Sequence, residues 1–245
     1  MTSLRSLVFS ISKHRQLIAQ MIKREVVGRY KGSIMGIFWA FFNPVFMLAI
    51  YTFVFSVVFK ARWGVGESET KAQFAVVLFA GLIVFNFFSE VVNRAPGLII
   101  SNVNYVKKVV FPLEILPIVS IGSALFHTAI SLCVLLAGFF IFNGFLHATV
   151  LLIPFVFIPL IIFIAGLAWI LASLGVFIRD LGQAMGLVTT TLIFLSPVFY
   201  SVGALPEKFQ PALMANPLTF IIEQARGVLI YGHFPDWIGL TIYTA

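Results

Sequence analysis

Aromatic side chains are the residues of this sequence best suited to do chemistry, since the chain holds 28 Phe, 6 Tyr and 4 Trp. Phe38, Phe42 and Phe46 recur every four residues and Phe53 follows seven later, so a helix would carry all four on one face. Flat rings bind the C–H faces of pyranose sugars, and weak contacts at many sites would let a sugar polymer slide. The alternative for any single ring is contact with lipid or helix packing. The candidate pathway residues are Phe38, Trp39, Phe42, Phe46, Tyr51, Phe199 and Tyr200.

Ionisable residues inside apolar stretches form the second group of candidates. Glu223 and Arg226 are three residues apart, and Glu90 and Arg94 are four apart, so each pair could meet on one helix face. The second pair favours a structural role for Glu90. His127 lies in the middle of an apolar run, where an ionisable group is a functional candidate by default. We expect instead a neutral histidine hydrogen-bonded to a neighbouring helix.

Motifs of the common enzyme classes do not occur in this sequence. It contains no G-x-x-x-x-G-K-[ST] phosphate loop, so the chain should not hydrolyse ATP itself. It contains no H-E-x-x-H, no G-x-S-x-G and no cluster of Cys and His. The single cysteine, Cys133, allows neither a disulfide within the chain nor a cysteine-based metal site. We therefore expect no enzyme activity and no cofactor in this chain.

Composition places these residues in a membrane. The 245 residues are 60% hydrophobic and only 10% charged, whereas a soluble domain has roughly 25% charged residues. The mean hydropathy is +1.05. The net charge of +7 suggests topology signals rather than nucleic-acid binding, because clustered Lys and Arg in membrane proteins mark cytoplasmic loops.

Apolar runs long enough to cross a bilayer, about 20 residues each, predict an all-α six-helix transmembrane bundle. We predict a sixth span from Trp237, of which nine residues are present, so it is incomplete in this chain. The first five predicted spans cover residues 34–59, 74–92, 116–142, 150–178 and 182–200.

The distribution of basic residues predicts the orientation of the spans. The segments 1–33, 93–115 and 179–181 would share one side of the membrane, and they carry 11 of the 16 Lys and Arg. The positive-inside rule places that side, and the N-terminus, in the cytoplasm. A multi-pass membrane protein is expected.

Three segments are not predicted to cross the membrane. Residues 4–30 have apolar residues at helical spacing among basic ones, which indicates one or two amphipathic helices at the interface, or else a basic arm. Residues 98–110 form a short amphipathic piece after Pro96 and Gly97, either a docking element for a soluble partner or an ordinary connector. Residues 202–235 suggest an external re-entrant helical hairpin, or else a surface loop with one amphipathic helix.

Several motifs, in order along residues 29–232, resemble the type-2 ABC exporter permeases. The first is R-Y-K-G-S at 29–33, followed by Met35-Gly36, Trp39 and Asn43-Pro44. The stretches N-Y-V-K-K at 104–108, F-P-L-E-I-L-P at 111–117, L-S-P-V-F-Y at 195–200 and N-P-L-T at 216–219 resemble the polysaccharide-export branch, as in O-antigen and teichoic-acid exporters. The resemblance implies one permease domain over residues 1–245, in a bacterial inner membrane.

The resemblance also implies partners and roles. It implies a homodimer with six helices per subunit, two copies of a separate ABC ATPase that bind the ATP and Mg²⁺, and a polysaccharide cargo linked to undecaprenyl diphosphate. The pore would form at the dimer interface, largely from the first and fifth spans. The residues implied in ATPase coupling are Asn102, Asn104, Tyr105, Lys107 and Lys108, and those implied in an external gate are Pro197, Asn216, Pro217, Glu223 and Arg226. Two alternatives stay open: a type-2 permease for a drug or lipid, and a membrane assembly subunit without a pathway.

Overall fold

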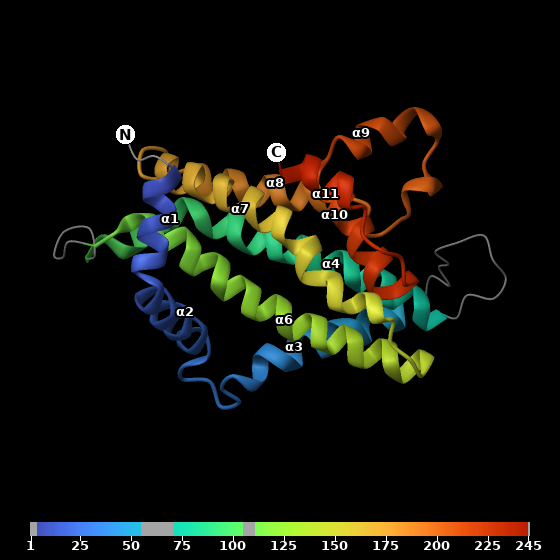
Figure 1. The fold of residues 1–245 in the computed structure, drawn as a ribbon. Helices are drawn as coiled ribbons and strands as arrows, with labels where there is room; N and C mark the ends of the chain where they lie inside the picture. The colour runs from blue at the N-terminus through green and yellow to red at the C-terminus, as the bar shows by residue number, and fades with distance from the viewer. Residues whose placement is uncertain (1–3, 55–70, 105–110, 245) are drawn as a thin grey trace.

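The computed structural model describes residues 4–54, 71–104 and 111–244, and within these ranges it consists of helices and connecting turns with no strand. Five long helices form a bundle, with two helices against one end and a group of short helices at the other (Figure 1). The five are α3 (Phe38–Phe53), α4 (Lys71–Arg94), α6 (Leu116–Asn143), α7 (Ile153–Gly175) and α8 (Leu181–Leu195).

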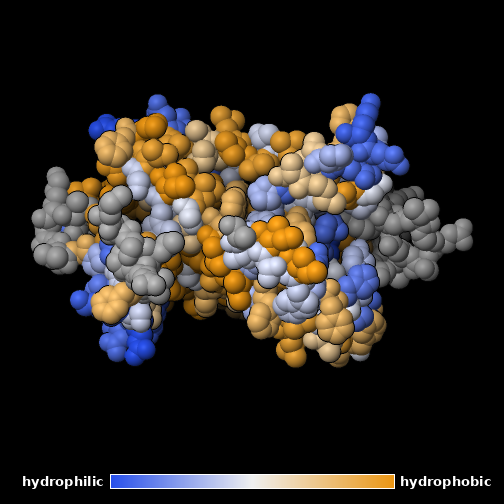
Figure 2. All heavy atoms as spheres, turned by 45° about the horizontal axis from the view of Figure 1, so that its top comes forward, coloured by the Kyte–Doolittle hydropathy of each residue, from blue (hydrophilic) through white to orange (hydrophobic). Residues whose placement is uncertain are grey.

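Three helical stretches of the described chain are long and apolar enough to cross a membrane. They are Phe74–Gly97, Leu113–Asn143 and Ala148–Gly175, each including short 3₁₀ turns next to the main helix. The apolar helices α3 and α8 are shorter, with 16 and 15 residues. The protein is therefore a multi-pass membrane protein. Hydrophobic residues cover much of the middle of the face seen in Figure 2.

Helix α4 lies at the centre of the bundle, where α3, α6, α7, α8 and α10 all pack against it. Its apolar residues from Phe74 to Val92 are all buried. The end of α4 continues into a 3₁₀ turn at Ala95–Gly97, where Pro96 removes a backbone donor and stops the helix. Helix α7 crosses this turn at Gly175, where a Cβ atom would lie 2.1 Å from the Pro96 carbonyl oxygen, so only glycine fits.

The two N-terminal helices confirm the prediction of helical structure over residues 4–30. Helix α1 (Leu4–Lys13) and helix α2 (Arg15–Tyr30) are separated at His14. Both lie beside one end of the bundle, and α2 packs on α6 (Figure 1). Ile18 of α2 is buried against Ile115 and Val119.

The segment after α8 folds into short helices at the opposite end of the bundle (Figure 1). Two 3₁₀ turns, Val202–Ala204 and Glu207–Phe209, lead to α9 (Gln210–Met214) and α10 (Pro217–Arg226). A π-helical turn, Gly227–Tyr231, follows α10 directly, and α11 (Trp237–Thr244) comes next. Helix α10 packs on α4 and α7, so this segment is anchored in the bundle rather than free in solution.

Two predicted spans have wrong boundaries. The first begins at Phe38 rather than at residue 34, because Gly32 and Gly36 take positive φ angles of 87° and 54° that turn the chain before the helix. Its predicted end at residue 59 lies outside the described residues. The fifth ends at Leu195 rather than at residue 200, since Ser196 is extended and Pro197 follows. Phe199 and Tyr200 therefore lie beyond α8.

Candidate functional site

The row of rings predicted on the first span exists in the structure. The ring centroids of Phe38 and Phe42 are 6.4 Å apart, and Phe42 stacks on Phe46 at 5.8 Å with an angle of 13°. Trp39 meets Phe42 edge to face at 5.4 Å. Phe38 and Phe46 are each 52% exposed, so the row is a surface feature of the single chain and is available to a partner, lipid or cargo.

The second aromatic group lies at the end of α8. The ring of Phe199 is 5.9 Å from that of Phe194, and the Tyr200 hydroxyl donates a hydrogen bond to the Phe194 carbonyl at 2.8 Å. These contacts fold the chain back after Pro197. Helices α3 and α8 both pack on α4, and Phe199 and Tyr200 lie in the turn that follows α8. Tyr51, also predicted in the pathway, is half-buried against the core.

The exposed side of α4 is a feature that the sequence reasoning missed. Of the α4 side chains described, only Asn86 and Asn93 are exposed, and Ser89 between them is half-buried. The Asn93 side-chain oxygen accepts a hydrogen bond from the Thr189 hydroxyl of α8 at 3.1 Å. The spacing of three and then four residues puts these polar groups on one helix face, and that spacing was visible in the sequence.

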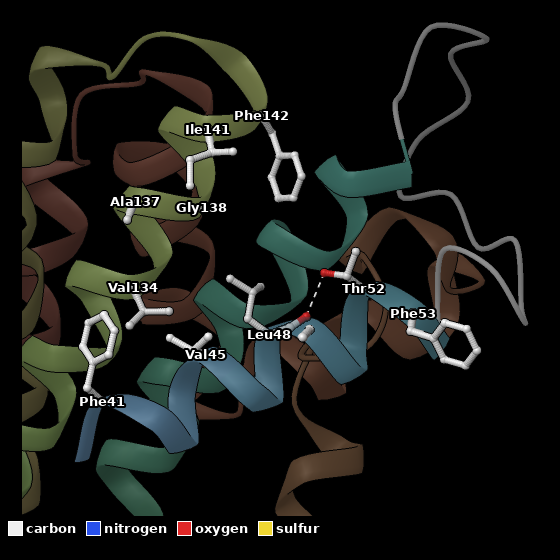
Figure 3. A pocket seen from close by; sticks show the side chains of 11 residues that line it. Phe41, Val45, Leu48, Thr52, Phe53, Val134, Ala137, Gly138, Ile141 and Phe142 are labelled. Carbon is white, nitrogen blue, oxygen red and sulfur yellow. Dashed lines mark hydrogen bonds between the residues drawn. The ribbon is translucent and has the colours of Figure 1, made fainter. Parts of the chain in front are cut away.

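An apolar groove of about 680 Å³ runs between α3 and α6. Figure 3 shows Val45 and Leu48 of α3 facing Val134 and Gly138 of α6. The one hydroxyl in its wall, that of Thr52, donates to the Leu48 carbonyl at 2.7 Å. The groove is therefore lined by apolar side chains, with no polar side chain among its described residues free to bind a ligand. Such a surface suits lipid chains better than sugars.

Arg226 is the centre of the cluster predicted to lie on the external side, and its side chain is fully buried. Its Nε donates to the Val77 carbonyl of α4 at 3.1 Å, and its Nη2 donates to the Val198 carbonyl at 2.9 Å. Its Nη1 bonds the Glu223 carboxylate at 2.9 Å, which confirms the predicted i,i+3 pair. One guanidinium thus joins α10 to the central helix and to the turn after α8.

Asn216 supplies a second connection at the same place. Its side-chain oxygen accepts a hydrogen bond from the Leu218 backbone N–H at 2.9 Å and so caps α10, with Pro217 in the first turn. Its amide nitrogen donates to the Ser196 hydroxyl at 2.9 Å. The five predicted gate residues Pro197, Asn216, Pro217, Glu223 and Arg226 therefore lie in one connected region at the end of α8.

A network of charges joins α2 to the predicted cytoplasmic end of α4. The Glu90 carboxylate lies 2.8 Å from the Arg29 guanidinium, 3.7 Å from that of Arg94 and 3.2 Å from the His127 ring on α6. Arg94 also pairs with Glu25 of α2. The predicted contact of Glu90 with Arg94, and that of His127 with a neighbouring helix, are both confirmed.

Tyr30 closes this network at the end of α2. Its ring meets the His127 ring edge to face at 6.1 Å. Burial raises the pKa of the Tyr30 phenol, and the neighbouring Arg29 charge opposes that change. The hydroxyl is therefore neutral at physiological pH and acts as a packing and hydrogen-bonding group.

The predicted coupling segment is described only in part. The Asn102 side chain donates to the Leu98 carbonyl at 2.8 Å and stabilises the turn Ile100–Asn102, while Asn104 is exposed. Tyr105, Lys107 and Lys108 lie outside the described residues. A pocket of about 570 Å³ with mixed polar and apolar walls opens between this segment, α2 and the end of α4, with Arg24, Glu25, Asn93, Arg94, Ser101 and Asn102 among its lining residues.

Within the described ranges, no group of three or more His, Cys, Asp and Glu residues could hold a metal ion. The described ranges instead show exposed aromatic rings on α3, a polar face on α4, a buried hydrogen-bonded Arg226 and a network of ion pairs around Glu90. Together with the apolar spans they define a multi-pass membrane protein.

Comparison with known proteins identifies the family. The chain belongs to the ABC-2 type transporter family, whose model matches residues 16–230. It is 26% identical to the O-antigen export system permease protein RfbA of Myxococcus xanthus, over 94% of this chain and 86% of that protein. It is also 26% identical to an O-antigen export system permease protein RfbA of Klebsiella pneumoniae, over 88% and 81% of the two chains. Identity to the polysialic acid transport protein KpsM of Escherichia coli is 23%, over 91% and 84%.

Proposed function

We propose that this chain is the channel-forming permease subunit of an ABC transporter that exports a lipid-linked polysaccharide across the inner membrane. The observation that carries the proposal is its similarity, over more than four-fifths of their length, to relatives named for O-antigen export and polysialic acid transport. The cargo is a polysaccharide carried on undecaprenyl diphosphate. The energy comes from hydrolysis of ATP, which a separate ATPase subunit binds together with Mg²⁺.

The exposed faces of α3 and α8 support a homodimer. Phe38, Phe42 and Phe46 on α3 and Leu187 and Phe194 on α8 are all exposed in the single chain. Both helices are apolar, so a second subunit beside them would cover these exposed side chains. A passage between two copies would then be lined by the rings of α3 and of the turn after α8. In this arrangement each subunit has six spans, a cytoplasmic N-terminus and a sixth span that starts with α11.

The two ends of the bundle have different roles in this proposal. At the cytoplasmic end, segment 93–115 contacts the ATPase, and the ion pairs of Glu25 and Glu90 tie α2 to the helix that this segment follows. At the external end, segment 202–235 closes the passage, with Arg226 holding α10 against α4. Movement of α4 would thus reach both ends through hydrogen-bonded contacts rather than through flexible loops.

A deletion strain tests the proposed function. Deletion of the gene in its own organism is expected to remove a surface polysaccharide and leave the polymer inside the cell, and deletion of the partner ATPase gene should do the same. Re-expression of the chain restores the surface polymer. An unchanged surface polysaccharide, together with loss of export of a drug or lipid, would assign another cargo. Polysaccharide export that persists without the chain, with no other export lost, would contradict a transport function.

A further inference from the structure

The outward side of α4 is polar although the helix is central and apolar. Every apolar side chain from Phe74 to Val92 is buried, and the two exposed side chains of the described part of α4 are Asn86 and Asn93. Ser89 lies between them on the same face and is half-buried. A helix that turned this side to lipid would be expected to carry Leu, Ile, Val or Phe there.

Asn86 lies at the middle of the span Phe74–Gly97, where it is farthest from either membrane surface. Its side-chain amide has no hydrogen-bond partner among the described residues, whereas the exposed Thr190 and Thr191 hydroxyls on α8 donate to carbonyls of their own helix at 2.8 and 3.0 Å. An amide in hydrocarbon without a partner is unfavourable, and polar groups in spans face protein or water. Lipid is therefore an unsuitable neighbour for Asn86.

The polar face continues into the pocket at the cytoplasmic end of α4. Asn93 is on this face and also lines the pocket of about 570 Å³ that Arg24, Arg94, Ser101 and Asn102 share. Asn86 lies seven residues further into the membrane, about 10 Å along the helix axis. The face therefore leads from an open pocket with charged and amide side chains in its wall to the centre of the span, without an exposed apolar side chain of α4 in between.

We propose that the face of α4 with Asn86, Ser89 and Asn93 borders a water-filled passage that begins at this pocket and reaches the middle of the membrane. The amide groups bind hydroxylated ligands there, since each offers two donors and one acceptor to the hydroxyls of a sugar chain. The identity of the ligand rests on the proposed function, whereas the access of water does not. Aromatic rings on α3 and after α8 would contact the C–H faces of the same sugars.

Cysteine accessibility in the intact complex tests the passage. Native Cys133 is exposed, so it is first replaced by Ala. Single cysteines are then placed at Asn86 and, as a matched control, at Ile162, which is 49% exposed near the middle of the span Ala148–Gly175. Since only a hydrated thiolate reacts with a charged methanethiosulfonate reagent, we expect Asn86→Cys to react at least about tenfold faster than Ile162→Cys. Ser89→Cys, a smaller change on the same face, gives a second reading if Asn86→Cys lowers abundance.

Each outcome decides the proposal. Fast reaction at Asn86 or Ser89 and slow reaction at Ile162 supports a water-filled passage. Equally slow reaction at all three positions would overturn it. Slow reaction with ready disulfide formation between two Asn86→Cys copies would also overturn it, because it would show a dry contact between subunits. If water reaches Asn86 while deletion of the gene leaves polysaccharide export intact, the passage stands and the proposed cargo fails.

The hydroxyl-binding role has its own readout. Asn86→Leu should retain normal abundance and reduce the surface polymer per subunit, and Asn86→Gln, which keeps an amide, should restore part of it. Export by Asn86→Leu equal to that of the parent protein would remove the amide from the passage.

Discussion

The buried Arg226 guanidinium is predicted to be the strongest single tie between the external segment and the bundle. Arg226→Met removes the hydrogen bonds to the Val77 and Val198 carbonyls and leaves both buried acceptors without this donor. Each charge-assisted bond of this kind contributes about 1.5–3 kcal/mol. Glu223 is 38% exposed at its side chain, so its ion pair adds little. A loss of about 3–5 kcal/mol in the free energy of unfolding is therefore expected.

This loss is measured as thermal stability of the purified protein in detergent. For a chain of this length, about 2–4 °C of melting temperature corresponds to each kcal/mol, so Arg226→Met should melt roughly 10 °C lower than the parent. Arg226→Lys keeps the charge but not the planar group with several donors, and it should fall in between. A melting temperature of Arg226→Met within 2–3 °C of the parent, about one kcal/mol by the same scale, would refute the assigned role.

A glycine pair provides the matched test of the same contact. A Cβ atom at Gly81 of α4 would lie 2.7 Å from Nη2 of Arg226, whereas one at Gly166 of α7 would meet nothing within 4 Å. Gly81→Ala must push the guanidinium away from its carbonyl partners and should cost about 1–3 kcal/mol. Gly166→Ala should leave stability equal or slightly higher, because Ala is the better helix former by up to about 1 kcal/mol. Equal melting temperatures of the two variants would contradict the reasoning.

Three further predictions concern the other regions. Glu90→Gln should weaken the attachment of α2 by about 1–3 kcal/mol, because the ion pair with Arg29 is lost. Protease cleavage in α1 and α2 should then be faster, whereas Glu207→Gln, at an exposed site, should leave it unchanged. Equal cleavage of the two variants would argue against the network. Replacement of Phe38, Phe42 and Phe46 by Leu should shorten or reduce the exported polymer more than it lowers protein abundance, because contacts of about 0.5–1.5 kcal/mol per ring are lost. Normal polymer at normal abundance would exclude these rings from the pathway. Cysteine at residue 68 should be labelled from outside intact cells and cysteine at residue 102 should not, and the reverse pattern would disprove a cytoplasmic N-terminus.

Much of the helical layout could be predicted from the sequence, because long apolar runs leave few alternatives in a membrane protein. The structure confirms helices over most of the second, third and fourth predicted spans and two helices within residues 4–30. The first and last residues of the helices were harder to predict. Hydropathy does not indicate where the backbone turns. The positive φ angles of Gly32 and Gly36 and the extended backbone at Ser196 set the helix ends instead.

The candidate site could be predicted only where the partners are close in sequence. Glu223 with Arg226, and Glu90 with Arg94, follow from helical spacing. The bonds from Arg226 to Val77 and Val198 join residues 149 and 28 positions apart, and Arg29 reaches Glu90 from another helix, so no spacing rule indicates them. Asn86 and Asn93 were overlooked for another reason: their spacing indicates a shared face, but only the packing of α4 shows that this face is the exposed one.

Transport by purified components tests the central proposal most directly. The permease and its partner ATPase are reconstituted into vesicles with lipid-linked polysaccharide on the outer leaflet, and the ATPase domains face outward. The account predicts ATP-dependent movement of the polymer into the lumen, no hydrolysis by the permease alone, and no movement when the phosphate-loop Lys of the ATPase is replaced. Polymer that stays outside in the presence of active ATPase, or transport that proceeds without this chain, would contradict the account.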